Sequence, residues 1–266
     1  MPAQSPFYCS VIGCGEPVIF VHGDSLFGEP VGHWLNQLEL AQEYQLIMPA
    51  RHGYYLSPSP ERESFDVYAS ALANLLGEGA HLVGHSYGGV VALLAAATRP
   101  EAVYSLTVSE PPAFGLVRGH EDVERFVARM QATPKPLAQM TPEEFTLHLH
   151  NAIFGPSQGE IEQLPQRLLD QLATPYGRKG AEANICEVLP WEADIPLDRL
   201  ANTPFPKLVF SSRTVPMHEA VCEVLAQRLR AEHAVISEAG HFIPRTKLYN
   251  DHLRMFLRKA RATSEH

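Results

Sequence analysis

One short motif restricts the fold of this chain more than any other feature of its sequence. Residues 81–97 form an apolar stretch, then the turn G-H-S-Y-G at positions 84–88, then a helical pattern. This is the G-x-S-x-G nucleophile elbow, in which a sharp turn between a strand and a helix strains a serine backbone and projects its hydroxyl above the sheet. Free N–H groups at the start of the helix favour developing negative charge beside that serine. The motif therefore predicts that Ser86 is a nucleophile in an α/β protein.

The rest of the chain alternates between two kinds of apolar pattern. Short runs rich in Val, Ile and Leu end in turn-forming residues, and we expect strands at 17–21, 44–48, 81–83, 103–108, 207–210 and 234–236. Helical patterns lie between several of them, at 65–76, 89–97, 219–230 and 250–259. Alternating strands and helices predict a doubly wound, mostly parallel sheet.

This alternation stops between residues 114 and 200. Helical patterns follow one another there without a convincing strand, and prolines interrupt them repeatedly. We interpret 114–200 as a helical cap, or lid, inserted into one core domain that consists of residues 1–113 and 201–266. A core of this size is common for undivided α/β domains, and an inserted cap usually supplies the walls of a pocket.

Charge and composition argue against several classes of function. The 266 residues carry a formal net charge of -9, and the basic residues are scattered, so nucleic acid is not expected as a partner. No apolar run approaches the roughly 20 residues of a membrane helix, and the first residues do not resemble a signal peptide. We therefore expect a cytoplasmic protein without a membrane segment. The four cysteines lack C-x-x-C spacing and are expected to be free thiols: Cys9, Cys14, Cys186 and Cys222.

Four motifs together resemble the α/β-hydrolase superfamily, in particular its capped branch of esterases, lactonases, carbon–carbon bond hydrolases and dehalogenases. They are VIFVHG at 18–23, PARHGYYLS at 49–57, the Ser86 elbow, and AGHF at 239–242. The second motif departs from the usual D-x-R-G-x-G-x-S pattern, because its Asp and second Gly are replaced. The resemblance implies the α/β-hydrolase fold, with a cap after the sixth strand, and chemistry that needs neither a metal nor another cofactor.

The resemblance places the general base at His241, in a Gly-His pair after the last predicted strand. A base late in the chain agrees with the order Ser, acid, His of this fold. Among the other histidines, we expect His85 to pack beside the elbow and His22 to hydrogen-bond the backbone of the oxyanion turn. His148 and His150 are two residues apart on different faces of a predicted helix, which argues against a metal site.

The acidic residue that would complete a catalytic triad with Ser86 and His241 is not at its usual position in this chain. Most relatives place an Asp in the loop after the strand predicted at 207–210, and this chain has none there. Some dehalogenase-like members instead place a Glu after the strand that follows the elbow helix. Glu110 stands at that point, followed by two prolines that restrict its backbone. We expect Glu110 to orient His241, and the alternatives are Glu219, in the first turn of a predicted helix, a dyad without an acid, or an unrecognised acid.

The resemblance assigns the oxyanion hole to the backbone N–H groups of Asp24 and Tyr87, with Ser25 as a further donor. The carboxylate of Asp24 would oppose a developing oxyanion, so we expect it to point away or to be hydrogen-bonded. Residues that could bind the substrate suggest an apolar or aromatic group on it: Ser25, Phe27, Trp34, Phe114, Phe154 and Trp191.

Together these features predict a serine hydrolase that forms an acyl-enzyme from a small molecule. The substrate would be a carboxylic ester, a lactone or a related carbonyl compound, such as a thioester or a vinylogous diketone. A serine nucleophile argues against dehalogenase and epoxide-hydrolase chemistry, which requires a carboxylate. Two other classes remain open: a lyase or cofactor-free oxygenase that uses Ser86 and His241 as acid and base, and a ligand-sensing protein with little turnover.

Overall fold

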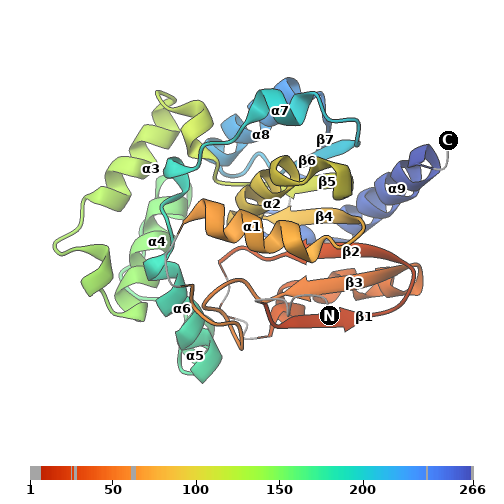
Figure 1. Ribbon diagram of the computed structural model, residues 1–266. Coiled ribbons are helices and arrows are strands. Elements are labelled where there is room, and N and C mark those ends of the chain that lie inside the picture. The colour runs from red at the N-terminus through yellow and green to blue at the C-terminus, as the bar shows by residue number, and fades with distance from the viewer. Residues whose placement is uncertain (1–6, 25, 27–28, 61–63, 238, 265–266) are drawn as a thin grey trace.

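A computed structural model describes residues 7–24, 26, 29–60, 64–237 and 239–264 of the chain. They form a seven-stranded sheet in the order β1-β3-β2-β4-β5-β6-β7 (Figure 1). The strands are β1 (Cys9–Ile12), β2 (Glu16–Val21), β3 (Tyr44–Pro49), β4 (Ala80–His85), β5 (Val103–Ser109), β6 (Lys207–Ser211) and β7 (Glu232–Val235). Every neighbouring pair is parallel except β1 and β3. The predicted doubly wound, mostly parallel sheet is therefore confirmed.

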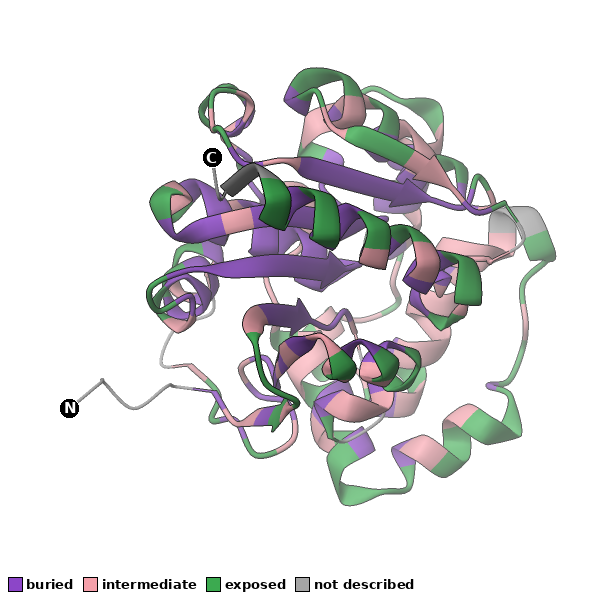
Figure 2. Cartoon of the chain, turned by 90° about the vertical axis from the view of Figure 1, so that its right-hand side faces the viewer, coloured by how far each residue is buried: buried purple, intermediate pink, exposed green. Residues whose placement is uncertain are grey.

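Helices cover both faces of this sheet. Ile19 and Val21 of β2 share one core cluster with α1 (Phe65–Leu75), α2 (Tyr87–Thr98) and α8 (Pro216–Leu229). Val18 and Phe20 belong to a second cluster, with the 3₁₀ helix η2 (Leu35–Gln42) and α9 (Lys247–Ser264). Figure 2 shows the buried strands in purple behind helices whose outer faces are green. Because successive side chains of a strand face opposite sides, strands covered on both faces are apolar throughout.

The structure differs from the sequence-based expectation at some element boundaries. Strand β1 was not predicted; it is short, contains the polar Ser10, and pairs antiparallel with β3 at the edge of the sheet. Helix α2 begins at Tyr87, two residues earlier than expected, directly after the nucleophile elbow. Strand β7 covers 232–235 instead of 234–236. These shifts leave the predicted order of elements unchanged.

Residues 114–200, called the helical segment below, follow β5, which is the fifth strand that the structure describes and not the expected sixth. The segment contains α3 (Glu121–Gln131), α4 (Pro142–Gln158), α5 (Gln166–Leu172), α6 (Pro175–Cys186) and the short α7 (Leu197–Ala201). Figure 1 shows α3 to α6 grouped to one side of the sheet. Helix α4 packs against α3, α5 and α6, and α3 packs against α8. Among the described helices, none combines the length and apolar character that a bilayer crossing requires.

Candidate active site

The backbone at Ser86 is strained in the way that a nucleophile elbow requires. Ser86 lies between β4 and α2 with φ 53° and ψ -131°. A Cβ atom added at Gly88 would lie 2.2 Å from the carbonyl oxygen of Val21, and one added at Gly84 would lie 2.6 Å from that of Gly88. Glycine is therefore required on both sides, because the helix crosses the strand ends too closely for side chains. The turn leaves Ser86 at the carboxyl end of β4.

Three of the predicted site residues are connected by hydrogen bonds. His241 Nε2 lies 3.1 Å from Ser86 Oγ, and His241 Nδ1 lies 2.7 Å from Glu110 Oε2. Glu110 follows β5 directly and is fully buried, with a left-handed φ of 44°. When Nδ1–H donates to this carboxylate, Nε2 is free to accept the Ser86 hydroxyl proton. The geometry is that of a nucleophile, a base and an orienting acid.

Ser212 holds the other oxygen of the Glu110 carboxylate. Its backbone N–H donates to Glu110 Oε1 at 2.8 Å, and its hydroxyl donates to the same atom at 2.5 Å. Burial opposes ionisation of Glu110, but hydrogen bonds and charge interactions, first those with His241, lower its pKa to about 2. Ser212 occupies the loop after β6 in which an acid was expected. The sequence analysis missed this role of Ser212. The feature that could have indicated it is a hydroxyl side chain in the loop where most relatives have the acid.

Glu219, the alternative acid, lies elsewhere. It is in the first turn of α8, where its Oε2 accepts a hydrogen bond from the backbone N–H of Arg213 at 3.2 Å. The described residues show no hydrogen bond between Glu219 and His241. The carboxylate that reaches His241 in this structure is therefore that of Glu110.

Buried histidines surround the His241 ring. His85 Nε2 donates to the carbonyl oxygen of His241 at 2.8 Å, and His85 Nδ1 accepts from His33 Nε2 at 2.9 Å. The His218 ring stacks on His241, with ring centroids 4.6 Å apart. Burial, and then the charge of His241, lowers the pKa of both His85 and His218 to about 3. Both are neutral near pH 7, so they add no positive charge against an imidazolium at His241. Sequence reasoning missed His33 and His218.

The turn after β2 lies against the nucleophile. A Cβ atom added at Gly23 would be 2.7 Å from Ser86 Cβ and 3.3 Å from Ser86 Oγ. His22 Nδ1 donates to the carbonyl oxygen of Gly23 at 2.7 Å, a backbone contact of the kind expected for this residue. Tyr87 is the first residue of α2, so its N–H has no carbonyl partner inside the helix. The backbones of Asp24 and Tyr87 thus flank Ser86.

The carboxylate of Asp24 is hydrogen-bonded to the guanidinium of Arg51. Arg51 Nη2 donates to Asp24 Oδ1 at 3.4 Å. Burial raises the pKa of Asp24, and the positive charge of Arg51 opposes this rise. The negative charge that would oppose an oxyanion is therefore paired with a cation.

A cavity of about 430 Å³ contains Ser86 and His241 in its lining. Helices α4 and α5 of the helical segment contribute much of its wall, together with residues that follow β7. Its larger apolar lining residues are Leu26, Leu149, Ile153, Phe154, Leu168 and Phe242. Two arginines, Arg167 and Arg245, also line it, whereas Asp24 is its only carboxylate among the described residues.

Most of the predicted substrate-binding aromatic residues that the structure describes lie outside this cavity. Phe154 lines it. Trp34 does not: it is fully buried and packs on Phe20, with ring centroids 5.1 Å apart. Phe114 and Trp191 do not line it either, and their rings lie 5.0 Å and 6.0 Å from that of Phe126. Large rings stabilise a core as readily as they form a pocket, so residue type alone could not separate the two. Ser25 and Phe27 lie outside the described residues.

The described residues contain no group of three or more His, Cys, Asp or Glu side chains placed to hold a metal ion. His150 lies on the cavity wall, with its ring 5.1 Å from that of Phe154. His148 Nε2 instead contacts the carbonyl oxygen of Met130 at 3.3 Å. The structure assigns none of the four described cysteines to a disulfide.

Comparison with known proteins agrees with this geometry. Residues 18–246 match the family described as "Alpha/beta hydrolase family". The pimeloyl-[acyl-carrier protein] methyl ester esterase of Aeromonas salmonicida is 28% identical over 249 residues, which cover 87% of this chain and 90% of that protein. An acetyltransferase component of the acetoin cleaving system of Cupriavidus necator is 32% identical over 135 residues, but the match spans only 35% of that protein and 48% of this chain. The structure of MenH from S. aureus superimposes with a TM-score of 0.73 at 17% identity, covering 95% of this chain and 98% of MenH.

Proposed function

The chain belongs to the alpha/beta hydrolase family, and we propose that it is a serine hydrolase that cleaves a carboxylic ester or a related carbonyl compound. The observation that carries this proposal is the continuous hydrogen-bonded path from Ser86 Oγ through His241 to Glu110. Each contact lies within the distance that proton transfer or ring orientation requires. The likeness to a methyl ester esterase over most of both chains supports an ester as the substrate class.

In the proposed mechanism, Ser86 Oγ attacks the carbonyl carbon while His241 Nε2 takes the hydroxyl proton. Glu110 stays ionised, orients the imidazole and stabilises the imidazolium. The N–H groups of Asp24 and Tyr87 donate to the oxyanion of the tetrahedral intermediate. His241 then protonates the leaving alcohol, and a water molecule activated by the same nitrogen releases the acyl group from Ser86.

We further propose that the helical segment acts as a cap over a core formed by residues 1–113 and 201–266. The placement of α4 and α5 in the wall of the cavity that contains Ser86 supports this division. A substrate would then be enclosed between the sheet edge and the cap, where exclusion of water strengthens the oxyanion contacts.

The cavity lining supports a substrate with an apolar chain. Leu149, Ile153 and Phe154 form a continuous apolar stretch on α4. Arg167 and Arg245 supply positive charge in the same cavity, in which Asp24 is the one carboxylate among the described lining residues. We therefore propose that an ester whose far end carries a negative charge binds better than its neutral analogue.

A fluorophosphonate probe combined with a substrate panel tests the proposed function. We expect the probe to label Ser86, and Ser86→Ala to abolish both labelling and hydrolysis of a p-nitrophenyl ester. The panel then compares an ester, a lactone, a thioester and a vinylogous diketone. Labelling of Ser86 without turnover of any of them would contradict the hydrolase and favour an acid–base lyase, an oxygenase or a ligand sensor.

A further inference from the structure

Arg51 connects three parts of the molecule that are far apart in the sequence. Its backbone N–H donates to His22 Nε2 at 3.0 Å, and its Nη2 donates to the carbonyl oxygen of Gly23 at 3.1 Å. Its Nη1 forms an ion pair with Glu187. The guanidinium also lies over the rings of Tyr54 and Tyr87, 4.6 Å and 4.7 Å from their centroids. The side chain is only 6% exposed, so these contacts replace water around its charge.

The contact with Gly23 bears directly on the oxyanion hole. The carbonyl of Gly23 and the N–H of Asp24 belong to one planar trans peptide unit, so the two groups point in opposite directions. His22 and Arg51 both donate to that carbonyl oxygen. By fixing the carbonyl, they also fix the direction of the Asp24 N–H, which is one of the two proposed oxyanion donors.

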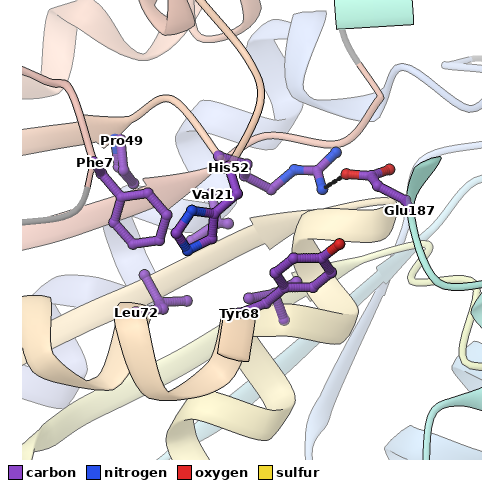
Figure 3. A pocket seen from close by; sticks show the side chains of 9 residues that line it. Phe7, Val21, Pro49, His52, Tyr68, Leu72 and Glu187 are labelled. Carbon is purple, nitrogen blue, oxygen red and sulfur yellow. Dashed lines mark hydrogen bonds and ion pairs between the residues drawn. The ribbon is translucent and has the colours of Figure 1, made fainter. Parts of the chain in front are cut away.

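The partner that holds Arg51 belongs to the helical segment. Glu187 directly follows α6, and a dashed line in Figure 3 marks the ion pair of its carboxylate. Its side chain is 6% exposed. The next residue, Val188, accepts a hydrogen bond through its carbonyl oxygen from the hydroxyl of Tyr87 at 2.9 Å. The helical segment therefore contacts the side chain of the second proposed oxyanion donor and, through Arg51, the peptide of the first.

We propose that Arg51 and Glu187 form a bridge through which the helical segment sets the orientation of the Asp24 N–H, so that the oxyanion hole is complete only when the segment is docked. Both are positioning residues. Without the Glu187 carboxylate, Asp24 is the one ionic partner that the buried guanidinium keeps among the described residues, which favours its movement away from Gly23. The catalytic meaning of the bridge rests on the proposed function, since the oxyanion in question is that of the proposed tetrahedral intermediate.

The test compares Glu187→Gln with the matched control Glu182→Gln. Glu182 lies on α6 as well, but it is exposed and its ion pair is with Arg178 on the same helix. We expect Glu187→Gln to lower kcat for p-nitrophenyl butyrate by tenfold or more, because losing one oxyanion donor costs about 100-fold to 1000-fold. KM should change less than twofold, and Glu187→Asp should restore part of kcat. The control should leave both constants unchanged.

Amide hydrogen exchange tests the coupling without any substrate. Glu187→Gln should accelerate exchange in peptides that cover residues 20–26, and Glu182→Gln should not. Unchanged exchange in Glu187→Gln, or a rise in KM alone, would overturn the bridge. If Glu187→Gln does not fold, Glu187→Asp gives the same comparison with a smaller expected effect. Absence of Ser86 labelling and ester turnover in the unmodified protein would instead refute the proposed function, and the exchange result would still decide the coupling.

Discussion

The two sides of the candidate site are held in place by different parts of the chain. On the acid side, Glu110 and Ser212 follow neighbouring strands of the sheet, and the histidines that pack around His241 are buried. On the oxyanion side, the Gly23 peptide is held by Arg51, whose ionic partner Glu187 comes from the helical segment. The difference indicates that the proton-transfer geometry is a property of the sheet, whereas the oxyanion geometry depends on how the helical segment is docked.

The largest expected effect is on the acid side. Glu110→Gln should lower kcat by about ten-thousandfold, because an amide at this position no longer fixes the imidazole in the required tautomer. Glu219→Gln should change kcat less than twofold. Steady-state kinetics on both variants, with circular dichroism to check folding, makes the comparison. Loss of turnover in Glu219→Gln alone would show that the acid is misassigned.

As the pH falls, the free energy of unfolding should decrease well before the carboxylates take up protons. The pKa values of His22, His85 and His218 are lowered to about 3 by burial, so below pH 6.5 the unfolded chain binds protons that the folded chain does not. Their stabilisation is complete above pH 6.5 and is lost as the pH falls toward 3, at about 1 kcal/mol per histidine per pH unit.

Urea unfolding at a series of pH values measures this loss. Between pH 6.5 and 4.5 the slope should come from the histidines, because Glu110, with its pKa of about 2, loses its contribution only below about pH 4.5. His218→Phe should reduce the slope by at most about a quarter, because burial also lowers the pKa of His33 well below its usual value. A free energy of unfolding that stays constant from pH 7 to pH 5 would contradict the prediction.

A smaller effect on kcat is expected from Ser212→Ala. This variant is informative because its effect can be combined with those of the other substitutions. Loss of its hydrogen bonds to Glu110 should lower kcat about tenfold, the equivalent of about 1.4 kcal/mol. The combination with Glu187→Gln should be additive, since Ser212 contacts Glu110 whereas Glu187 pairs with Arg51. The combination with Glu110→Gln should not be additive. A strong coupling between Ser212 and Glu187 would show that the two sides of the site are not independent.

The smallest effect is expected from Tyr87→Phe, which keeps the backbone N–H but removes the hydroxyl that donates to Val188. It should weaken docking of the helical segment by about 1 kcal/mol. Amide exchange around residue 188 should therefore accelerate about fivefold, while kcat falls less than threefold. Unchanged exchange at this position would mean that other contacts hold this end of the segment.

The acid side was predictable from sequence to a greater extent than the oxyanion side. Glu110 could be proposed because local pattern places it at the end of a strand, and the resemblance to dehalogenase-like members implies an acid at that point. The contact between Arg51 and Glu187 joins residues 136 positions apart through a buried ion pair, and no periodicity marks such a partner. The sequence likewise does not tell whether Trp34 lines a pocket or lies in the core, since its burial depends on how β2 and η2 pack together.

The closeness of Ser86 and Glu110 in the sequence affects how the site can be inherited. Ser86 and Glu110 both belong to the continuous unit formed by β4, α2 and β5, and the backbone N–H of Ser86 donates to the carbonyl oxygen of Ser109 at 2.9 Å. The proposed acid and the nucleophile are therefore encoded close together, in one short stretch of the gene. A chimera that exchanges everything after residue 113 with a distant relative would keep Ser86 and Glu110 in register. The incoming half would need to supply the histidine, a donor that holds Glu110 and the carboxylate that pairs with Arg51.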